Sequence, residues 1–397
     1  MSASSVAGTE RVVHPPAKFP FLDLKAQFAG IRGEVTAAVM AVLESQHFIL
    51  GPEVSALERE IAAYIGCNHA IGCASGSDAL LLALMALGVG PGDEIITVPF
   101  TFVATAGSIA RLRAKPVFVD IDPISYNIDA LQIEQAITPR TKAIIPVHLF
   151  GMAADMDPIR EIAAGRGIAV IEDAAQAIGA TYRGRHVGTL GTLACFSFFP
   201  SKNLGGGGDG GMITTDDDKL AEKLRVLRVH GSRKKYAYAV LGLNSRLDAM
   251  QAAILRAKLP YLEAWAELRR RNADRYRSMF GKARLSRVSL PVVPADRVHV
   301  YNQFTIRVPQ RDALRSHLQA AGIPTEVYYP SPLHLEGAFV DLGYQCGDLP
   351  RCERACNEVV SLPVFPELRE EHQNVVVNAI ADFFHSSQYE RIADVSA

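Results

Sequence analysis

The chain has 397 residues, and because domains usually span roughly 100–200 residues, it corresponds to two or three domains. Lysine and arginine (41) nearly balance aspartate and glutamate (42), so the net charge of −1 creates no long-range attraction to nucleic acid or to an anionic membrane. No apolar stretch approaches the ~20 residues of a membrane span, and residues 1–20 lack the apolar core of a secretion signal. We therefore expect a cytoplasmic protein that begins with a flexible arm over residues 1–20.

Along the chain, helical patterns over residues 35–43 and 54–64 come first. Short β-branched runs then alternate with helical segments, which predicts a parallel sheet with crossover helices. Such sheets bind ligands at the carboxyl ends of their strands, and Ser75, Phe102, His148 and Asp173 each follow a predicted strand. We expect these side chains to converge on one pocket. The predicted strands are residues 69–73, 94–98, 115–119, 142–147, 169–171, 194–198 and 212–215, and the predicted helices are residues 79–87, 101–112 and 217–229.

A smaller second region follows a long helical stretch. This stretch begins at residue 247, is interrupted at Pro260 and resumes to about residue 279. The pattern then changes to strand 301–308, helix 311–321, strand 325–329 and helix 371–384. The sequence thus predicts an α/β protein with a large domain over residues 21–259 and a smaller α+β domain over residues 260–397.

The six cysteines are expected to be reduced and unpaired. Cys346, Cys352 and Cys356 are spaced as C-x5-C-x3-C, which lacks the C-x2-C pairs of zinc sites, and no histidine lies at ligand spacing. A metal or iron–sulfur site is the alternative interpretation. Unpaired thiols in a cytosolic protein are favoured, so we expect no metal.

Lys202 follows the segment Ser197-Phe198-Phe199-Pro200-Ser201 and precedes the glycine run 205–208. Upstream, residues 170–173 are typical of a buried strand that ends in an acid, Asp173. These parts suit an enzyme that uses pyridoxal 5′-phosphate (PLP), whose aldehyde forms a Schiff base with a lysine and whose protonated pyridine nitrogen pairs with an acid. Taken alone, Lys202 is equally well explained as a surface lysine, and Asp173 as the N-cap of the next segment.

A phosphate group needs backbone N–H groups and hydroxyls at a helix N-terminus. Ser75, Gly76 and Ser77, at a strand-to-helix turn, offer two hydroxyls and a glycine that allows close backbone approach. An ordinary helix cap at Ser77 or Asp78 explains the same segment and is favoured when the segment is taken alone. Ser197 is a further candidate for a phosphate contact.

Three other residues are candidates for the same ligand. Gln176, three residues after Asp173, can donate to the phenolic oxygen of the PLP ring or face solvent instead. Phe102 can stack on the ring or belong to the core. Asn244 would ordinarily be a helix cap.

Taken together, these segments resemble the DegT/DnrJ/EryC1/StrS family of nucleotide-sugar aminotransferases. The resemblance extends in collinear order from about residue 20 to about residue 380, and several independent motifs carry it. It implies a PLP-dependent aminotransferase of fold type I, usually a homodimer with active sites at the interface. The motifs are Phe21-Leu22-Asp23-Leu24, Leu50-Gly51-Pro52-Glu53, Gly76-Ser77-Asp78-Ala79-Leu80, Pro99-Phe100-Thr101-Phe102, Val119-Asp120-Ile121-Asp122, Pro146-Val147-His148-Leu149-Phe150-Gly151, Glu172-Asp173-Ala174-Ala175-Gln176, Phe196 to Asn203, Asp209-Gly210-Gly211 and Asn244-Ser245-Arg246-Leu247-Asp248.

The resemblance also implies roles for the candidate residues. It implies ping-pong transamination, in which an amino group passes from L-glutamate to the keto carbon of a nucleotide-linked sugar and Lys202 moves the proton. In these roles, Lys202 carries the Schiff base, Asp173 holds the pyridine nitrogen, Gln176 holds the phenolic oxygen, Phe102 stacks on the ring, Ser75, Gly76, Ser77 and Ser197 bind the phosphate, and Asn244 reaches the phosphate of the neighbouring subunit's cofactor.

The expected substrate is a UDP- or dTDP-linked sugar with its ketone at C3, because the chain most resembles that branch of the family. Arg246 is a candidate partner for a carboxylate on the sugar, and an arginine that faces the helix surface or a phosphate is the equal alternative. Tyr328 stands where relatives often have histidine. Nearby, Tyr329 and His334 are candidate substrate contacts, with core packing as the alternative for Tyr329.

Two other functions compete with transamination. A dehydratase branch of the family has histidine in place of the lysine, so Lys202 disfavours dehydration. A PLP-binding regulator would be expected to carry a DNA-binding module. The basic run over residues 225–235 is better explained as a solvated helix end or a nucleotide-phosphate site.

Overall fold

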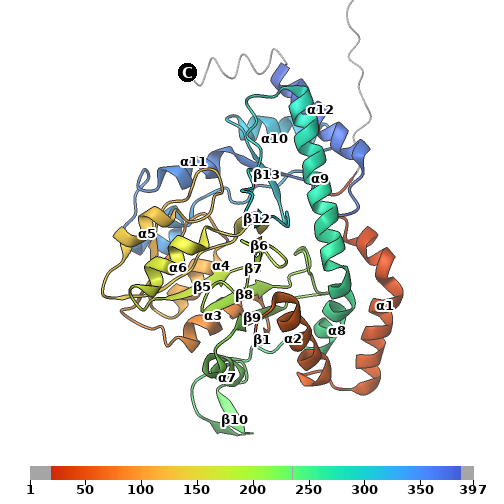
Figure 1. Cartoon of the computed structure of the whole chain (residues 1–397). Coiled ribbons are helices and arrows are strands. Elements are labelled where there is room, and N and C mark those ends of the chain that lie inside the picture. The colour runs from red at the N-terminus through yellow and green to blue at the C-terminus, as the bar shows by residue number, and fades with distance from the viewer. Residues whose placement is uncertain (1–18, 235, 386–397) are drawn as a thin grey trace, which may run out of the picture.

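The computed structural model describes residues 19–234 and 236–385 (Figure 1). Apart from Phe19 and Pro20, the arm expected over residues 1–20 lies outside the described residues. Two helices, α1 (Leu24–Ser45) and α2 (Gly51–Ile65), precede the first strand.

Seven strands form the central sheet, in the order β1-β9-β8-β5-β4-β2-β3. The neighbouring pairs from β8 to β3 are parallel, whereas β9 is antiparallel to both β1 and β8. The predicted mostly parallel sheet is therefore confirmed, while the direction of β9 was not anticipated. The strands are β1 (His69–Cys73), β2 (Glu94–Thr97), β3 (Lys115–Phe118), β4 (Thr141–Ile144), β5 (Ala169–Asp173), β8 (Leu193–Ser197) and β9 (Gly211–Thr215).

Helices cover both faces of this sheet, because adjacent residues of one strand enter different hydrophobic clusters. Ile96 and Val170 pack with α2 and α6 on one face. Ile95 and Ile171 pack with α3, α4 and α7 on the other. Strands buried on both faces need continuous apolar runs rather than alternation. These helices are α3 (Gly76–Ala86), α4 (Ala104–Arg111), α5 (Ala130–Ala136), α6 (Met156–Ala164) and α7 (Asp218–Leu227).

A nearly continuous helical rod links this layer to a second core (Figure 1). It consists of α8 (Ala249–Lys258), the 3₁₀ turn Leu259–Tyr261 at the predicted proline break, and α9 (Leu262–Ala283). In the second core, Tyr276 of α9 stacks on Phe304 at 5.0 Å between ring centroids. The remaining elements of this core are α10 (Arg311–Ala320), α12 (Glu370–His385) and the antiparallel pair β13 (Phe304–Arg307) and β14 (Val359–Leu362).

The prediction of a strand over residues 325–329 is wrong. Within it, Glu326 makes a single bridge to Ser361, and β14 pairs with β13 instead. Val327, Tyr328 and Tyr329 line the cavity described below. An apolar, aromatic run has the same pattern in a strand and in a pocket wall, so the sequence alone does not separate the two.

After α10, the chain returns to the first core. The 3₁₀ segments Leu333–Leu335 and Gly337–Leu342 and the helix α11 (Pro350–Glu358) pack against it. Asp120 accepts hydrogen bonds from the backbone amides of Arg351 and Cys352, at 2.9 Å each, and so satisfies free N–H groups at the start of α11. The division into domains 21–259 and 260–397 stays a prediction.

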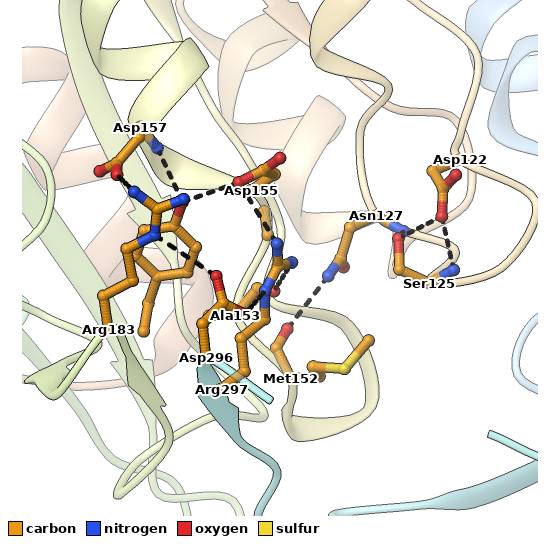
Figure 2. Close-up of polar contacts among 12 residues, drawn as sticks. Asp122, Ser125, Asn127, Met152, Ala153, Asp155, Asp157, Arg183, Asp296 and Arg297 are labelled. Atoms are coloured by element: carbon orange, nitrogen blue, oxygen red, sulfur yellow. Dashed lines mark hydrogen bonds and ion pairs between the residues drawn. The ribbon is translucent and has the colours of Figure 1, made fainter. Parts of the chain in front are cut away.

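A polar cluster fastens the segment before β13 to the first region (Figure 2). There, β12 (Arg297–Val298) pairs with β6 (Thr181–Tyr182), which also pairs with β7 (Arg185–His186). Arg297 contacts Asp155 at 3.3 Å, and Tyr182 donates to the same carboxylate at 2.7 Å. Exposed ion pairs contribute little singly, but this network fixes the direction in which the chain enters β13.

Two exposed apolar features lie away from this cluster. Helix α1 packs on α8 through Ile31, Val35 and Val42, yet Phe28 and Met40 stay exposed. By length and composition alone, α1 is apolar enough to cross a membrane, which the sequence-based expectation did not anticipate. The hairpin of β10 (Ser232–Lys234) and β11 (Ala237–Tyr238) extends from the body of the molecule (Figure 1).

Candidate active site

A cavity of about 930 Å³ contains most of the predicted site residues. It lies at the carboxyl ends of the parallel strands, where β5 ends at Asp173 and β8 ends at Ser197. Its volume lies within the usual range for a site that binds a small molecule or cofactor. The predicted residues that line it are Ser75, Gly76, Ser77, Phe102, Asp173, Gln176, Ser197, Lys202 and Tyr329.

Lys202 lies in the turn after β8, and its side chain is half-buried and lines the cavity. Its backbone N–H donates to the Phe199 carbonyl at 2.8 Å. The next turn requires glycine at position 205, because a Cβ there would lie 2.2 Å from the Pro200 carbonyl oxygen. Burial lowers the pKa of Lys202 from 10.5 to about 8, although the charge of Asp173 opposes this shift. About a tenth of this amine is therefore neutral and nucleophilic at pH 7, far more than for an ordinary lysine with a pKa of 10.5.

This pKa gives a pH dependence for binding of a carbonyl compound. When PLP is added to the apoprotein, we expect the rate of chromophore formation to rise with pH up to about 8 and then level off. The reason is that the amine is mostly neutral above its own pKa. Absorbance measured at a series of pH values checks this. A rate that keeps rising to pH 10 would indicate an ordinary exposed lysine.

Asp173 is buried at the end of β5 and lacks a directly bonded cation among the described residues. Its Oδ2 accepts a hydrogen bond from the Thr105 hydroxyl at 2.7 Å, and its Oδ1 accepts one from the Ala175 amide at 3.2 Å. Burial raises the pKa of Asp173, while these two bonds and the charge of Lys202 oppose the rise. A protonated ring nitrogen placed here would remove this penalty, so the carboxylate fits the role predicted for it.

Thr105 is a site residue that the sequence interpretation missed. It lies in the first turn of α4, and its hydroxyl is 3.0 Å from that of Thr101, one helical turn earlier. Both hydroxyls are buried. The i, i+4 spacing of two threonines just after a strand was the signal that could have found this pair.

Replacing Thr105 with valine should raise the pKa of Asp173 further, because the hydroxyl stabilises the ionised form. We expect the acidic limb of the pH–rate profile to move to higher pH and the rate at neutral pH to fall about tenfold. Thr105→Ser should restore both. Ser108→Ala is the matched control, since Ser108 is buried in the same helix but donates to the Thr105 carbonyl. An unmoved profile in Thr105→Val would contradict the assignment.

His148 does not join the cavity, contrary to the expectation from its place after a strand. It is fully buried, and its Nδ1 accepts from the Ala154 amide at 3.0 Å, so its Nε2 donates to Glu172 at 2.9 Å. Glu172 also accepts from the amides of Gly188, Leu190 and Gly191. Adjacent residues of a strand point to opposite sides, so Glu172 braces the sheet from behind while Asp173 faces the cavity.

Gln176 and Tyr329 form a hydrogen-bonded pair in the cavity wall. The Oε1 of Gln176 accepts from the Phe150 amide at 2.7 Å, which leaves its Nε2 to donate to the Tyr329 hydroxyl at 3.2 Å. Burial raises the pKa of Tyr329, so the phenol is neutral. The fixed amide presents a donor to the cavity, as a role at a phenolic oxygen requires.

The start of α3 forms a tight cradle. The N-cap residue is Ser75, not Ser77 or Asp78 as the cap alternative had it, and its hydroxyl accepts from the Asp78 amide at 3.1 Å. A Cβ at Gly76 would lie 2.6 Å from the Cβ of Ser197, so only glycine allows this approach. The free N–H groups of this helix and the hydroxyls of Ser77 and Ser197 fit a phosphate group.

Three predicted residues are not among those that line the cavity of the described chain. Asn244 is exposed and bridges to Val229. Arg246 is half-buried, and its Nε has no hydrogen-bond partner. His334 is buried, with its Nε2 3.1 Å from Glu353, which places it in the packing of the α11 region.

Sequence reasoning also missed Arg269, Asn302 and Gln303, which line the cavity from the second region. Arg269 is one of three consecutive arginines in α9. It shares the buried face of that helix with Ala266, Ala273 and Tyr276. This 3.6-residue periodicity is the signal that distinguishes it from its neighbours.

Known proteins resemble this chain over nearly its whole length. The model of the DegT/DnrJ/EryC1/StrS aminotransferase family matches residues 30–381. A "Pleiotropic regulatory protein" of Geobacillus stearothermophilus is 57% identical over 92% of this chain and 98% of its own. A "UDP-N-acetyl-3-dehydro-alpha-D-glucosamine 3-aminotranferase" of Acidithiobacillus ferrooxidans is 49% identical over the same shares. A "dTDP-3-amino-3,4,6-trideoxy-alpha-D-glucose transaminase" of Streptomyces venezuelae is 47% identical over 96% and 98%.

Solved structures agree with the fold. DesV of S. venezuelae, in complex with a ketimine intermediate, superposes with a TM-score of 0.90 at 46% identity and covers 94% of this chain and 100% of its own. NtdA of Bacillus subtilis, with bound cofactor PMP, has a TM-score of 0.86 at 33% identity over 92% and 85%. The predicted fold type I is thus confirmed. The chain belongs to the DegT/DnrJ/EryC1/StrS aminotransferase family.

Proposed function

We propose that this protein is a PLP-dependent aminotransferase that moves an amino group from L-glutamate to the keto carbon, at C3, of a UDP- or dTDP-linked sugar. One observation carries the proposal: a half-buried lysine and a buried carboxylate, Lys202 and Asp173, line the same cavity and influence each other's charge. Each is costly to bury alone. A cofactor that bonds to the amine and pairs with the carboxylate would offset the cost of burying both groups.

When bound, PLP supplies a ring that delocalises the electron pair left at the reacting carbon. Lys202 would hold the cofactor's aldehyde carbon and, as the free amine, would move the proton that leaves the donor's α-carbon. Asp173 would keep the ring nitrogen protonated, and the Nε2–H of Gln176 would be the donor to the phenolic oxygen. The start of α3 and Ser197 would hold the phosphate, and Phe102, of whose surface 57% is exposed, would cover the ring.

Relatives guide the choice of sugar. Two of those compared are named for amination of UDP- and dTDP-linked sugars at C3. In this chain, the neighbouring residues Tyr328 and Tyr329 both line the cavity. We propose that these aromatic side chains bound the sugar, and that Arg246 meets a carboxylate or phosphate of the substrate.

The active unit is proposed to be a homodimer in the cytoplasm. Asn244 is exposed, and it does not line the cavity of its own described chain. Exposed apolar side chains of α1 are also available for burial. These features suit a second copy that covers α1 and receives Asn244 at its cofactor phosphate.

A PLP-binding regulator is the second candidate, because the relative with 57% identity is named a regulatory protein. A regulator that binds PLP without turnover would not need a free amine beside the acid. A dehydratase is disfavoured, since Lys202 occupies the position at which that branch has histidine.

One experiment separates these functions. The PLP-loaded protein is treated with L-glutamate, desalted, and then mixed with UDP- or dTDP-linked 3-keto or 4-keto sugars one at a time. We expect glutamate to bleach the visible chromophore and a 3-keto sugar to restore it. Recovery only with a 4-keto sugar would correct the position of amination. Absence of bleaching by any amino acid would favour the regulator.

A further inference from the structure

Three arginines are buried among the described residues, and only two of them have a carboxylate within 4 Å. Arg228 pairs with Glu58, and Arg311 pairs with Asp312 at 2.6 Å. Arg269, although only 4% exposed, has no such partner in the part of the chain that the structure describes. A buried charge without a counter-ion is costly, so such a group in a cavity wall points to a ligand.

The guanidinium of Arg269 is held firmly from one side. Its Nη1 donates to the carbonyl oxygens of Tyr301 at 3.0 Å and Val364 at 2.5 Å. Among the described residues, no acceptor bonds to its Nε or Nη2, and the residue lines the cavity. The guanidinium is thus fixed in place by its Nη1, and its Nε and Nη2 N–H groups can still donate to a ligand.

The nearest opposing charge does not neutralise it. Glu367 influences Arg269, but not within ion-pair distance, and its own Oε2 has no hydrogen-bond partner. Burial raises the pKa of Glu367 and lowers that of Arg269 to about 10, so Arg269 stays protonated at neutral pH. The cavity wall therefore carries a protonated guanidinium at this point that is not directly paired with a carboxylate.

From this geometry, we infer that Arg269 binds a carboxylate of the amino-acid donor. A planar guanidinium with two free donors matches a carboxylate in a bidentate arrangement. The phosphate has a separate cradle at α3 and Ser197, whereas Arg269 lines the cavity from α9, where it contacts the carbonyls of Tyr301 and Val364. The inference rests on the proposed function, because it assigns a subsite to the donor of that reaction.

The test measures binding of glutarate, which has two carboxylates and no amine, to the PLP-loaded protein by titration calorimetry. Arg269→Lys keeps the positive charge but loses the planar guanidinium, and we expect it to weaken glutarate binding roughly ten- to hundredfold. Arg311→Lys is the matched control, since the Nη1 of Arg311 also bridges two carbonyls, at 3.0 and 3.1 Å, away from the cavity. It should leave glutarate binding unchanged.

Rapid mixing with L-glutamate adds a second readout. In Arg269→Lys, the glutamate concentration at half-maximal bleaching should rise by a similar factor, with a smaller change in the maximal rate. Because loss of the carbonyl bonds can impair folding, Asn302→Asp is the second variant. This substitution leaves those bonds intact and places a competing carboxylate in the same cavity wall. It should therefore also weaken the binding of glutarate.

The inference is overturned if glutarate does not bind the wild-type protein, or if it binds Arg269→Lys and Asn302→Asp as tightly as wild type. The inference is also overturned if Arg269→Lys weakens only the binding of PLP, which would make Arg269 a phosphate ligand, or only the binding of the sugar nucleotide. A wild type that binds glutarate through Arg269 but transfers no amine from glutamate refutes the proposed function alone.

Discussion

Lys202→Ala is expected to reduce turnover by roughly 10⁴-fold, the upper end of what a proton-transferring side chain contributes. The variant should still fold, because the lost amine is a group whose charged form burial disfavours. It should also still bind PLP, through the phosphate cradle and Asp173. Steady-state rates with L-glutamate and a ketosugar, together with the absorbance of bound PLP, check both parts.

Lys258→Met is the control for this substitution. Lys258 is a buried lysine whose Nζ donates to the Gly205 carbonyl at 2.7 Å, and it is not among the cavity-lining residues of the described chain. The protein with this change should keep the visible chromophore, whereas Lys202→Ala should lose it. Undiminished turnover in Lys202→Ala would refute the assignment of the reactive lysine.

Asp173→Asn is expected to lower the rate of the glutamate half-reaction by at least about 100-fold, a loss typical of removing a well-placed electrostatic partner. The amide has the size of the carboxyl and can still accept from Thr105, so the fold should persist. It cannot pair as an anion with a protonated ring nitrogen. Single-turnover absorbance after mixing with glutamate measures the loss.

Two results sharpen this second prediction. Asp173→Asn should lose the acidic limb of the pH–rate profile that Thr105→Val only shifts, because the amide does not titrate in that range. PLP should remain bound through Lys202 and the phosphate cradle. A rate within about threefold of wild type would mean that Asp173 does not control the ring nitrogen.

The sequence alone was sufficient for the parts of this fold and site that depend on local pattern. The end of β5 was predictable because its apolar run stops at an acid, which located Asp173, whereas the strand predicted over residues 194–198 ran one residue past the observed end of β8 at Ser197. Lys202 followed from its place between a strand and a glycine run. Gly76 followed from the need for close approach at the turn before α3, and the structure gives the reason, the Cβ of Ser197.

Other features depend on contacts between distant segments. The bond from Thr105 to Asp173 joins residues 68 positions apart, and no local pattern encodes it. Arg269 becomes part of the cavity because the carbonyls of Tyr301 and Val364 hold it there. Strand β14 was not predicted, and its pairing with β13 joins segments more than 50 residues apart, such as Phe304 with Leu362.

The position of Asn244, Arg246 and His334 shows a further limit of motif reasoning. A motif specifies neighbours in sequence, whereas the side chains that face a cavity depend on packing. His334 lies in an apolar segment near Tyr329, but Glu353 holds its ring in the α11 region. Asn244 and Arg246 are not among the residues that line the cavity of the described chain.

Nitrogen transfer tests the central claim most directly. The protein would be incubated with [¹⁵N]-L-glutamate, PLP and a UDP- or dTDP-linked 3-keto sugar, and the sugar product would be analysed by ¹⁵N-edited NMR. The account predicts ¹⁵N bonded to C3 of the sugar, with loss of the label in Lys202→Ala. A sugar recovered without ¹⁵N, although PLP is bound and each donor amino acid has been tried, would contradict it.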